Sequence, residues 1–267
     1  MSLLMNALRS VARPRRDEAP PVPAPASAEA PAWHTLGTQT GMQHQHYGDI
    51  ERPFVEQMFD HVPRRLLDIG CSSGAVGSGL KGSIPGLWVW GCEINPDSAR
   101  MAATRLDHVT AAPRDQWGEA DLALVRTVDT VLMLDVLEHM YNPWAELQFL
   151  AANLPDDAQV IVSMPNIGHY SVLQGLAEGA FPYGPIGILD VTHVRFFTFT
   201  GMVAMFEETG FDVDENWVTS YTRNIELTSF PTPVAMGKLV FNVASAEEWA
   251  RLNAIQYGFR LSLKPRR

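Results

Sequence analysis

The stretch 65–74 (RLLDIGCSSG) constrains the fold more than any other part of this chain. An apolar run with Asp68 near its end passes into a turn that contains Gly70 and Gly74, and the small-residue segment 75–80 follows. This order is typical of a buried parallel strand that passes into a helix through a loop that a ligand can approach closely. We therefore predict that this turn is the floor of a nucleoside-cofactor site.

Apolar segments alternate with helical segments along the rest of the chain. We predict strands at 65–69, 87–92, 108–112, 128–134, 159–164, 211–218 and 257–263. Predicted helices occupy 52–61, 75–81, 96–106, 143–153, 200–209 and 247–253. The alternation predicts an α/β fold with a Rossmann-like, doubly wound, mostly parallel seven-stranded sheet and an antiparallel closing strand. Ligands of such sheets bind at the carboxyl ends of the strands, so polar residues there are the candidates for function.

Residues 1–32 differ in composition from the remainder. They are rich in Pro and Ala and carry a net charge of +1, which leaves −11 for the rest of the chain. We predict a disordered tail here, with a weak membrane or partner contact by residues 1–16 as the alternative. The predicted domain occupies 33–267, with an insert at about 167–199 between the fifth strand and the next helix. A loop that contains Pro231 and Pro233 is predicted at 224–238.

The overall composition narrows the class of partner. A formal net charge of −10 argues against a nucleic-acid partner, which needs a basic footprint. No apolar run of about 18 residues occurs, so we expect no membrane span, and the segment 1–12 does not fit a secretory signal. Cys71 and Cys92 end predicted buried strands and are expected to be free thiols, which suits a cytoplasmic location. The sequence does not indicate an oligomeric state.

A literal G-x-G-x-x-G at 77–82 suggests a dinucleotide, but its position is wrong. It begins seven residues after Gly70, inside the predicted helix, whereas the pyrophosphate fingerprint needs its first glycine at the strand-to-helix turn. The turn that lies in the right place has Asp68 before its glycines and no phosphate-binding lysine, which favours a cofactor with a positive charge. Glu93 ends the next strand, where its carboxylate can accept both hydroxyls of a ribose.

These strand-end residues, together with DVLEH at 135–139, resemble the class I S-adenosylmethionine (SAM)-dependent methyltransferases over about residues 45–264. The resemblance implies SAM as cofactor and methyl transfer as the reaction. It also implies that the cofactor contacts Asp68, Gly70, Cys71, Ser72, Gly74, Glu93, Ile94, Asp135 and Val136. Ser72 stands where the family usually has a second glycine, and because serine is small we expect the loop to keep its shape.

The acceptor is indicated by the predicted insert, which is rich in His, Tyr, Phe and Asp. Its sequence resembles a subgroup of bacterial methyltransferases associated with surface-polysaccharide and glycan biosynthesis. The resemblance implies a small-molecule or glycan acceptor and, most specifically, O-methylation of a sugar or glycan intermediate. The alternatives are a nicotinamide-dependent sugar oxidoreductase or epimerase, which lacks its Tyr-x-x-x-Lys pair because Gln174 stands at the Lys position, and a non-catalytic SAM-binding regulatory subunit.

Three histidines are candidates for a catalytic base that accepts the proton of the acceptor hydroxyl. His139 is the leading candidate, and His169 and His193 follow. The alternative is a structural role, in which His193 pairs with Asp190 and Arg195 inside the insert.

The DVLEH segment at 135–139 could also contribute to a metal site. Asp135, Glu138 and His139 share one face of a helical turn, and with a histidine from the insert they could form an oxygen-rich Mg²⁺ site. The alternative, which we favour from the sequence, is that Glu138 and His139 cap the following helix or line the pocket. We therefore predict no metal ligands.

Overall fold

The computed structural model describes residues 52–221 and 227–265. The predicted tail at 1–32 and its basic segment therefore lie outside the described residues, and so does part of the loop predicted at 224–238. Among the helices of the described residues, none is both long and apolar enough to cross a membrane.

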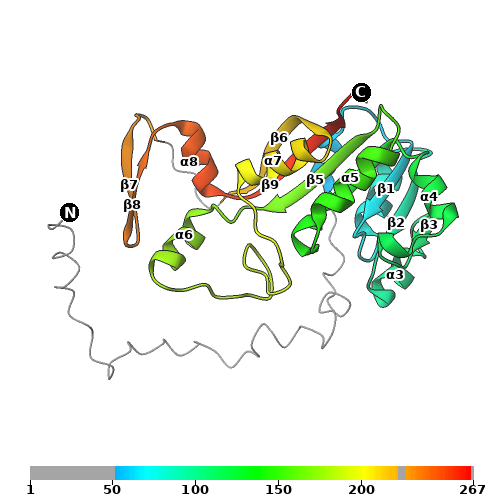
Figure 1. The fold of residues 1–267 in the computed structure, drawn as a ribbon, viewed down its shortest axis with the longest axis horizontal. Coiled ribbons are helices and arrows are strands. Elements are labelled where there is room, and N and C mark those ends of the chain that lie inside the picture. The colour runs from blue at the N-terminus through cyan, green and yellow to red at the C-terminus, as the bar shows by residue number, and fades with distance from the viewer. Residues whose placement is uncertain (1–51, 222–226, 266–267) are drawn as a thin grey trace, which may run out of the picture. The chain divides into compact units, whose positions relative to one another are not determined.

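A seven-stranded sheet forms the centre of the described domain (Figure 1), with the strand order β3-β2-β1-β4-β5-β9-β6. The strands are β1 (Arg65–Ile69), β2 (Trp88–Cys92), β3 (His108–Thr110), β4 (Thr130–Leu134), β5 (Gln159–Pro165), β6 (Phe211–Tyr221) and β9 (Ala254–Leu263). β1 to β5 pair in parallel, and β9 lies antiparallel between β5 and β6. The predicted mostly parallel sheet with one antiparallel strand is confirmed, and the strand order reverses between β1 and β4.

Helices cover both faces of the sheet because successive strand residues point to opposite sides. Their bounds are η3 (Pro53–Met58), α2 (Ala75–Ser83), α3 (Pro96–Ala102), α4 (Glu119–Val125), α5 (Pro143–Asn153) and α7 (Phe199–Glu208). Leu66 and Leu132 pack with residues of η3, α2 and α3. Leu67 and Val131, one position along the same strands, pack with residues of α4, α5 and α7. Each fully buried leucine contributes roughly 1.5–3 kcal/mol, so the two apolar layers hold the strand ends in register.

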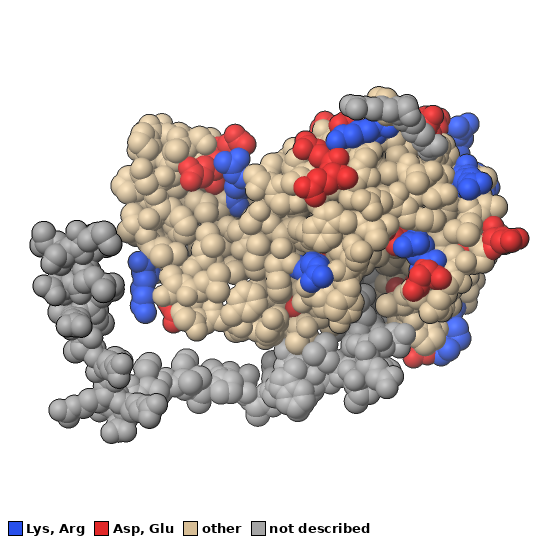
Figure 2. Space-filling view, viewed as in Figure 1, with Lys and Arg blue, Asp and Glu red and all other residues tan. Residues whose placement is uncertain are grey.

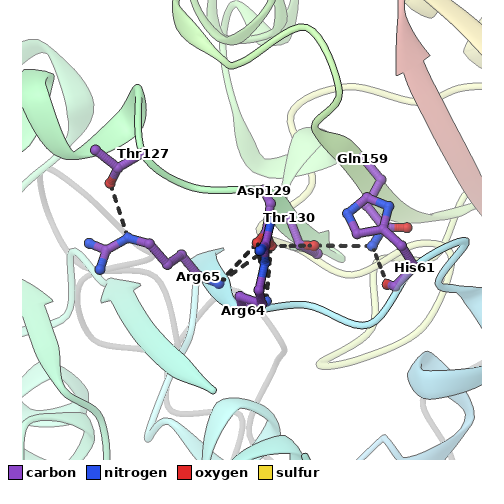
Figure 3. Close-up of polar contacts among 7 residues, drawn as sticks. All are labelled: His61, Arg64, Arg65, Thr127, Asp129, Thr130 and Gln159. Atoms are coloured by element: carbon purple, nitrogen blue, oxygen red, sulfur yellow. Dashed lines mark hydrogen bonds and ion pairs between the residues drawn. The ribbon is translucent and has the colours of Figure 1, made fainter. Parts of the chain in front are cut away.

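Polar contacts join the amino ends of three strands (Figure 3). The carboxylate of Asp129 accepts from the backbone N–H of Arg65 at 3.3 and 3.4 Å. The side-chain amide of Gln159 donates to Thr130 Oγ1 at 3.1 Å and to the His61 carbonyl at 2.9 Å. This network lies at the opposite end of the strands from the predicted cofactor loop, so we assign it to the structure and not to the site.

Charged side chains are mixed on the face seen in Figure 2. Basic side chains (blue) and acidic side chains (red) lie near one another there, and most of the visible surface belongs to uncharged residues (tan). Ion pairs among the described residues include Lys81 with Asp107 at 2.8 Å and Arg114 with Glu146 at 2.7 Å.

A β-hairpin occupies part of the segment for which the sequence predicted only a loop. Its strands β7 (Thr232–Met236) and β8 (Leu239–Val243) form a separate two-stranded sheet. The hairpin was not predicted because β7 contains Pro233. Proline argues against a strand in the middle of a sheet, but it is tolerated in an edge strand. The turn uses Gly237 at φ 59°, a conformation that suits glycine.

The hairpin shares a small second core with two helices, α6 (Tyr170–Ala177) and α8 (Ala246–Asn253). Its buried members are Tyr170, Met236, Val243 and Trp249. α6 belongs to the predicted insert at 167–199, and the Ile167 N–H donates to the Phe197 carbonyl at 2.9 Å. Residues near the two ends of the insert are therefore joined, next to the carboxyl end of β5.

Candidate active site

The turn between β1 and α2 lies very close to the end of β4. Gly70 has φ 73°, and a Cβ added there would lie 2.6 Å from Cγ2 of Val136. Gly74 has φ 77° and donates its N–H to the Cys71 carbonyl at 2.8 Å. The Cys71 thiol is free and buried against Gly91, as expected for a structural cysteine. Glycine at position 70 is thus required by both its backbone angle and the close approach.

Ser72 and Glu93 fix the shape of this loop together. Ser72 adopts the left-handed conformation with φ 48°, so the loop keeps its turn although serine stands in place of a glycine. Its N–H donates to Glu93 Oε2 at 2.9 Å, and the Asn95 N–H donates to Oε1 at 2.7 Å. A carboxylate oxygen can accept more than one hydrogen bond, which suits a pair of ribose hydroxyls. Ile94 is half-buried beside this carboxylate.

Asp68, at the end of β1, is a buried carboxylate with an unsatisfied atom. It is 3% exposed, and its Oδ2 has no hydrogen-bond partner among the described residues. Burial raises the pKa of Asp68 to about 7, the nearby Arg52 lowers it and Glu93 raises it. A cationic ligand would compensate this carboxylate, which agrees with the positive charge expected of the cofactor.

Asp135 follows β4 and is held by three side chains. Arg52 donates to its Oδ2 at 2.6 Å, Ser163 Oγ donates to its Oδ1 at 2.9 Å, and Gln256 also donates to Oδ1. Asp135 has φ 58°, a strained angle for a residue other than glycine. The sequence did not indicate Arg52, Ser163 or Gln256, because they come from segments far apart along the chain.

A second group of side chains, Glu138, His139 and His193, lies beyond this strand end. Glu138 and His139 are in the short helix η5 (Leu137–His139), and His193 comes from the insert. One ligand atom from each of the three lies within 4.8 Å of the others. Backbone N–H groups of Val194 and Arg195 donate to the Glu138 carbonyl at 2.9 and 3.0 Å, so the insert is fastened to η5.

The hydrogen bonds of the two histidines assign their tautomers. The Thr192 hydroxyl donates to Asp190 Oδ1 at 2.7 Å, so it accepts from His139 Nδ1 at 3.1 Å. The Thr192 carbonyl is a second acceptor near Nδ1, at 3.3 Å. His193 Nδ1 faces the Ile188 carbonyl at 3.0 Å. Both rings therefore carry their proton on Nδ1 and a lone pair on Nε2.

Burial changes the acidity of all three groups. It raises the pKa of Glu138 well above its ordinary value, and Asp135 raises it further. It lowers the pKa of His139 to about 4, with His193 as the second cause, and it lowers the pKa of His193. At neutral pH both imidazoles are neutral, and His139 is a weak proton acceptor.

His169 lies apart from this group. Its Nδ1 accepts from the Ser171 N–H at 3.2 Å and so caps the start of α6. His193 does pair inside the insert, through Nδ1 with the Ile188 carbonyl and through its N–H with the Asp190 carbonyl, both at 3.0 Å. The side chains of Asp190 and Arg195 do not take part, because Asp190 binds Thr192 and Arg195 donates to the Tyr141 carbonyl at 2.7 Å.

The favoured alternative for Glu138 and His139 was that they cap the following helix or line the pocket; the capping role is wrong, and the pocket-lining role stays a prediction. Asn142 caps α5 by accepting from the Ala145 N–H at 3.2 Å. Glu138 and His139 are buried in η5, ahead of that cap.

The strand order, the glycine turn at the switch point and the acid at the end of β2 together define the class I methyltransferase type. A family model described as a methyltransferase domain matches residues 42–216, and the chain belongs to this family. No curated protein matches the chain. The protein is therefore a SAM-dependent methyltransferase. The literal G-x-G-x-x-G at 77–82 lies within α2, not at the strand-to-helix turn.

Solved structures share the fold at low sequence identity. A SAM-dependent methyltransferase from Archaeoglobus fulgidus is 18% identical with a TM-score of 0.52, covering 79% of this chain and 90% of its own. A SAM-dependent methyltransferase from Thermotoga maritima is 16% identical with a TM-score of 0.51, covering 79% and 86%. The plantazolicin methyltransferase, solved in complex with SAH, is 11% identical with a TM-score of 0.52, covering 79% and 80%.

Proposed function

We propose that this methyltransferase methylates a hydroxyl group of a small polar acceptor, and that the acceptor is a sugar or glycan intermediate. The observation that carries the proposal is the buried group of Glu138, His139 and His193, which joins the cofactor half of the domain to the insert. Three polar side chains whose ligand atoms lie within 4.8 Å of one another suit a hydroxyl, which must be oriented and must lose its proton during methylation.

Aromatic side chains of the insert support the choice of a sugar. Their ring centroids form a chain from His193 to Phe196 at 6.3 Å, from Phe196 to Phe181 at 5.6 Å and from Phe181 to Tyr183 at 5.4 Å. Tyr183 is 52% exposed, so the chain of rings leads from the buried group to the surface. Aromatic faces pack well on the C–H faces of a sugar ring, while the phenolic hydroxyl can bond its polar edge.

The cofactor side of the site rests on Asp68, Gly70, Ser72 and Glu93. SAM supplies a methyl group on a positively charged sulfonium. In this proposal the Asp68 carboxylate faces the positive charge, and Gly70 leaves room for the ligand to approach the backbone. The carboxylate of Glu93 accepts the ribose hydroxyls. Ile94 and Val136 provide apolar contact with the cofactor. Asp135, which is bound by Arg52, lies by the methionine end of the cofactor.

The acceptor class can be tested with SAM that carries a labelled methyl group. We expect transfer to sugar nucleotides or monosaccharides, with the label recovered in an alkali-stable methyl ether. Small amines, phenols and carboxylic acids are the comparison set. Label found on nitrogen or in an alkali-labile ester, and none on any sugar, would contradict the proposal. Glu93→Gln should weaken SAM binding at least tenfold by calorimetry, and unchanged binding would remove Glu93 from its proposed role.

A further inference from the structure

We infer that Glu138, His139 and His193 bind one divalent transition-metal cation, and that this cation orients the acceptor hydroxyl. The site itself follows from the side chains in the structure, and its use in orienting the acceptor rests on the function proposed above.

The spacing of the three side chains fits a single ion. Their ligand atoms lie within 4.8 Å of one another. In a tetrahedral site with bonds of about 2.1 Å, ligand atoms lie roughly 3.4 Å apart. Small side-chain rotations therefore close the group around an ion. The insert is fastened to η5 through the Glu138 carbonyl, so the third ligand is held near the other two.

Glu138 is the strongest indication of a missing partner. Its side chain is 1% exposed, and neither carboxylate oxygen has a hydrogen-bond partner within the described ranges 52–221 and 227–265. A buried carboxylate without hydrogen bonds or a counter-charge is unfavourable, and native proteins rarely leave one in this state. A cation at this point supplies the missing charge and takes one carboxylate oxygen as a ligand.

The histidines are oriented as metal ligands usually are. Each donates Nδ1–H to oxygen, so Nε2 carries the lone pair that a metal needs. Asp190 accepts from the Thr192 hydroxyl, and that hydroxyl accepts from His139. Such outer contacts fix the ring of a metal-bound histidine and its tautomer.

The ligand set selects the kind of metal. Two imidazoles and one carboxylate suit Zn²⁺, Co²⁺, Mn²⁺ or Fe²⁺, whereas Mg²⁺ prefers oxygen ligands and water. The Mg²⁺ site considered from the sequence included Asp135, but that carboxylate is bound by Arg52, Ser163 and Gln256. Three protein ligands leave an open position for the acceptor oxygen, as in catalytic metal sites.

A cation also accounts for how the hydroxyl could lose its proton. A hydroxyl next to a divalent cation has a lowered pKa, so its proton can pass to solvent water. In this arrangement the two histidines act as ligands instead of bases.

Metal binding can be measured without activity. The full-length protein is stripped with a chelator and dialysed against Co²⁺, Zn²⁺ or Mg²⁺, and bound metal is counted by mass spectrometry. We expect one Co²⁺ or Zn²⁺ per chain, a visible Co²⁺ absorption band and little Mg²⁺. Glu138→Gln and His193→Ala should each lower Co²⁺ affinity at least about 100-fold. His108→Gln removes a half-exposed histidine on β3 and should keep wild-type affinity.

SAM affinity serves as the folding control, since it should stay within about twofold in Glu138→Gln. Wild-type protein that binds no Co²⁺ or Zn²⁺, or equal affinity in the wild type and Glu138→Gln, would overturn the site. Sugar methylation that is unaffected by chelation would overturn its role in orienting the acceptor. Metal binding without sugar methylation would overturn the proposed acceptor and leave the metal site standing.

Discussion

Asp68 couples the cofactor loop to pH through its burial. Its pKa is raised from 3.8 to about 7 in the folded protein, chiefly by burial. The folded state therefore holds this proton more tightly than the unfolded state. The stabilisation is complete below about pH 4 and is lost as pH rises through 7, a change on the order of 4 kcal/mol.

Asp68→Asn should remove this contribution. Urea unfolding at pH 5 and pH 8 would measure it, with SAM absent. We expect the wild type to lose more stability between the two pH values than Asp68→Asn does, because the amide does not titrate. Equal losses in the two proteins would mean that Asp68 ionises normally. Asp60→Asn, which changes a more exposed carboxylate, is the matched control.

Gly70 offers a second test at the residue scale. Gly70→Ala places a side chain at φ 73° and brings its Cβ to 2.6 Å from Val136. We expect a loss of about 3 kcal/mol in the free energy of unfolding, from the left-handed conformation and from overpacking. Val136→Ala in the same chain should restore part of the loss by removing the contact. A double variant whose loss equals the sum of the single losses would show that the contact is unimportant.

At the scale of elements, the start of α3 stabilises the site indirectly. Asn95 caps this helix by accepting from the N–H groups of Asp97 and Ser98 at 2.9 and 3.1 Å. Asn95→Ala should cost about 1 kcal/mol in chemical unfolding, and Asn95→Ser should cost much less because serine also caps helices. Equal losses for the two variants would assign the effect to burial of Asn95 rather than to capping.

The sequence predicted elements well where local signals agree. The bounds of β1 and α5 match the structure, because each begins or ends at a clear signal such as Pro63 before β1 or Asn142 before α5. The helix α4 was missed because it is only seven residues long and has a glycine at its cap. The hairpin β7–β8 was missed because its first strand contains a proline and because both strands pack on a core formed with distant helices.

The sequence also indicated some parts of the candidate site better than others. The residues of the cofactor loop are close in sequence and follow one strand, so a short pattern indicates them. Glu138, His139 and His193 meet only because the insert folds back onto η5, and no local spacing shows that contact. Arg52 precedes η3 and Gln256 lies in β9, so both are far from Asp135 along the chain. Their contacts with Asp135 could be recognised only from the folded structure.

At the scale of the whole domain, the two cores differ greatly in size. Among the described residues, the core around α6, α8 and the hairpin has four buried apolar members, whereas the larger core of the sheet has 27. Stability is not uniform in such a structure, and the smaller unit should open locally. Amide hydrogen exchange should therefore be much faster in β7 and β8 than in β4 and β5. Equal protection would show that the domain opens as one unit.

The position of β9 has a consequence for synthesis. The ribosome synthesises β5 and β6 before residues 254–263. β5 can already pair with β4, but the sides of β5 and β6 that bind β9 have no strand partner until β9 is made. Two strand edges therefore stay open for as long as translation takes to reach β9. Open edges invite pairing with other chains. The strand order thus means that the seven-stranded sheet is completed only when its last strand along the sequence has been synthesised.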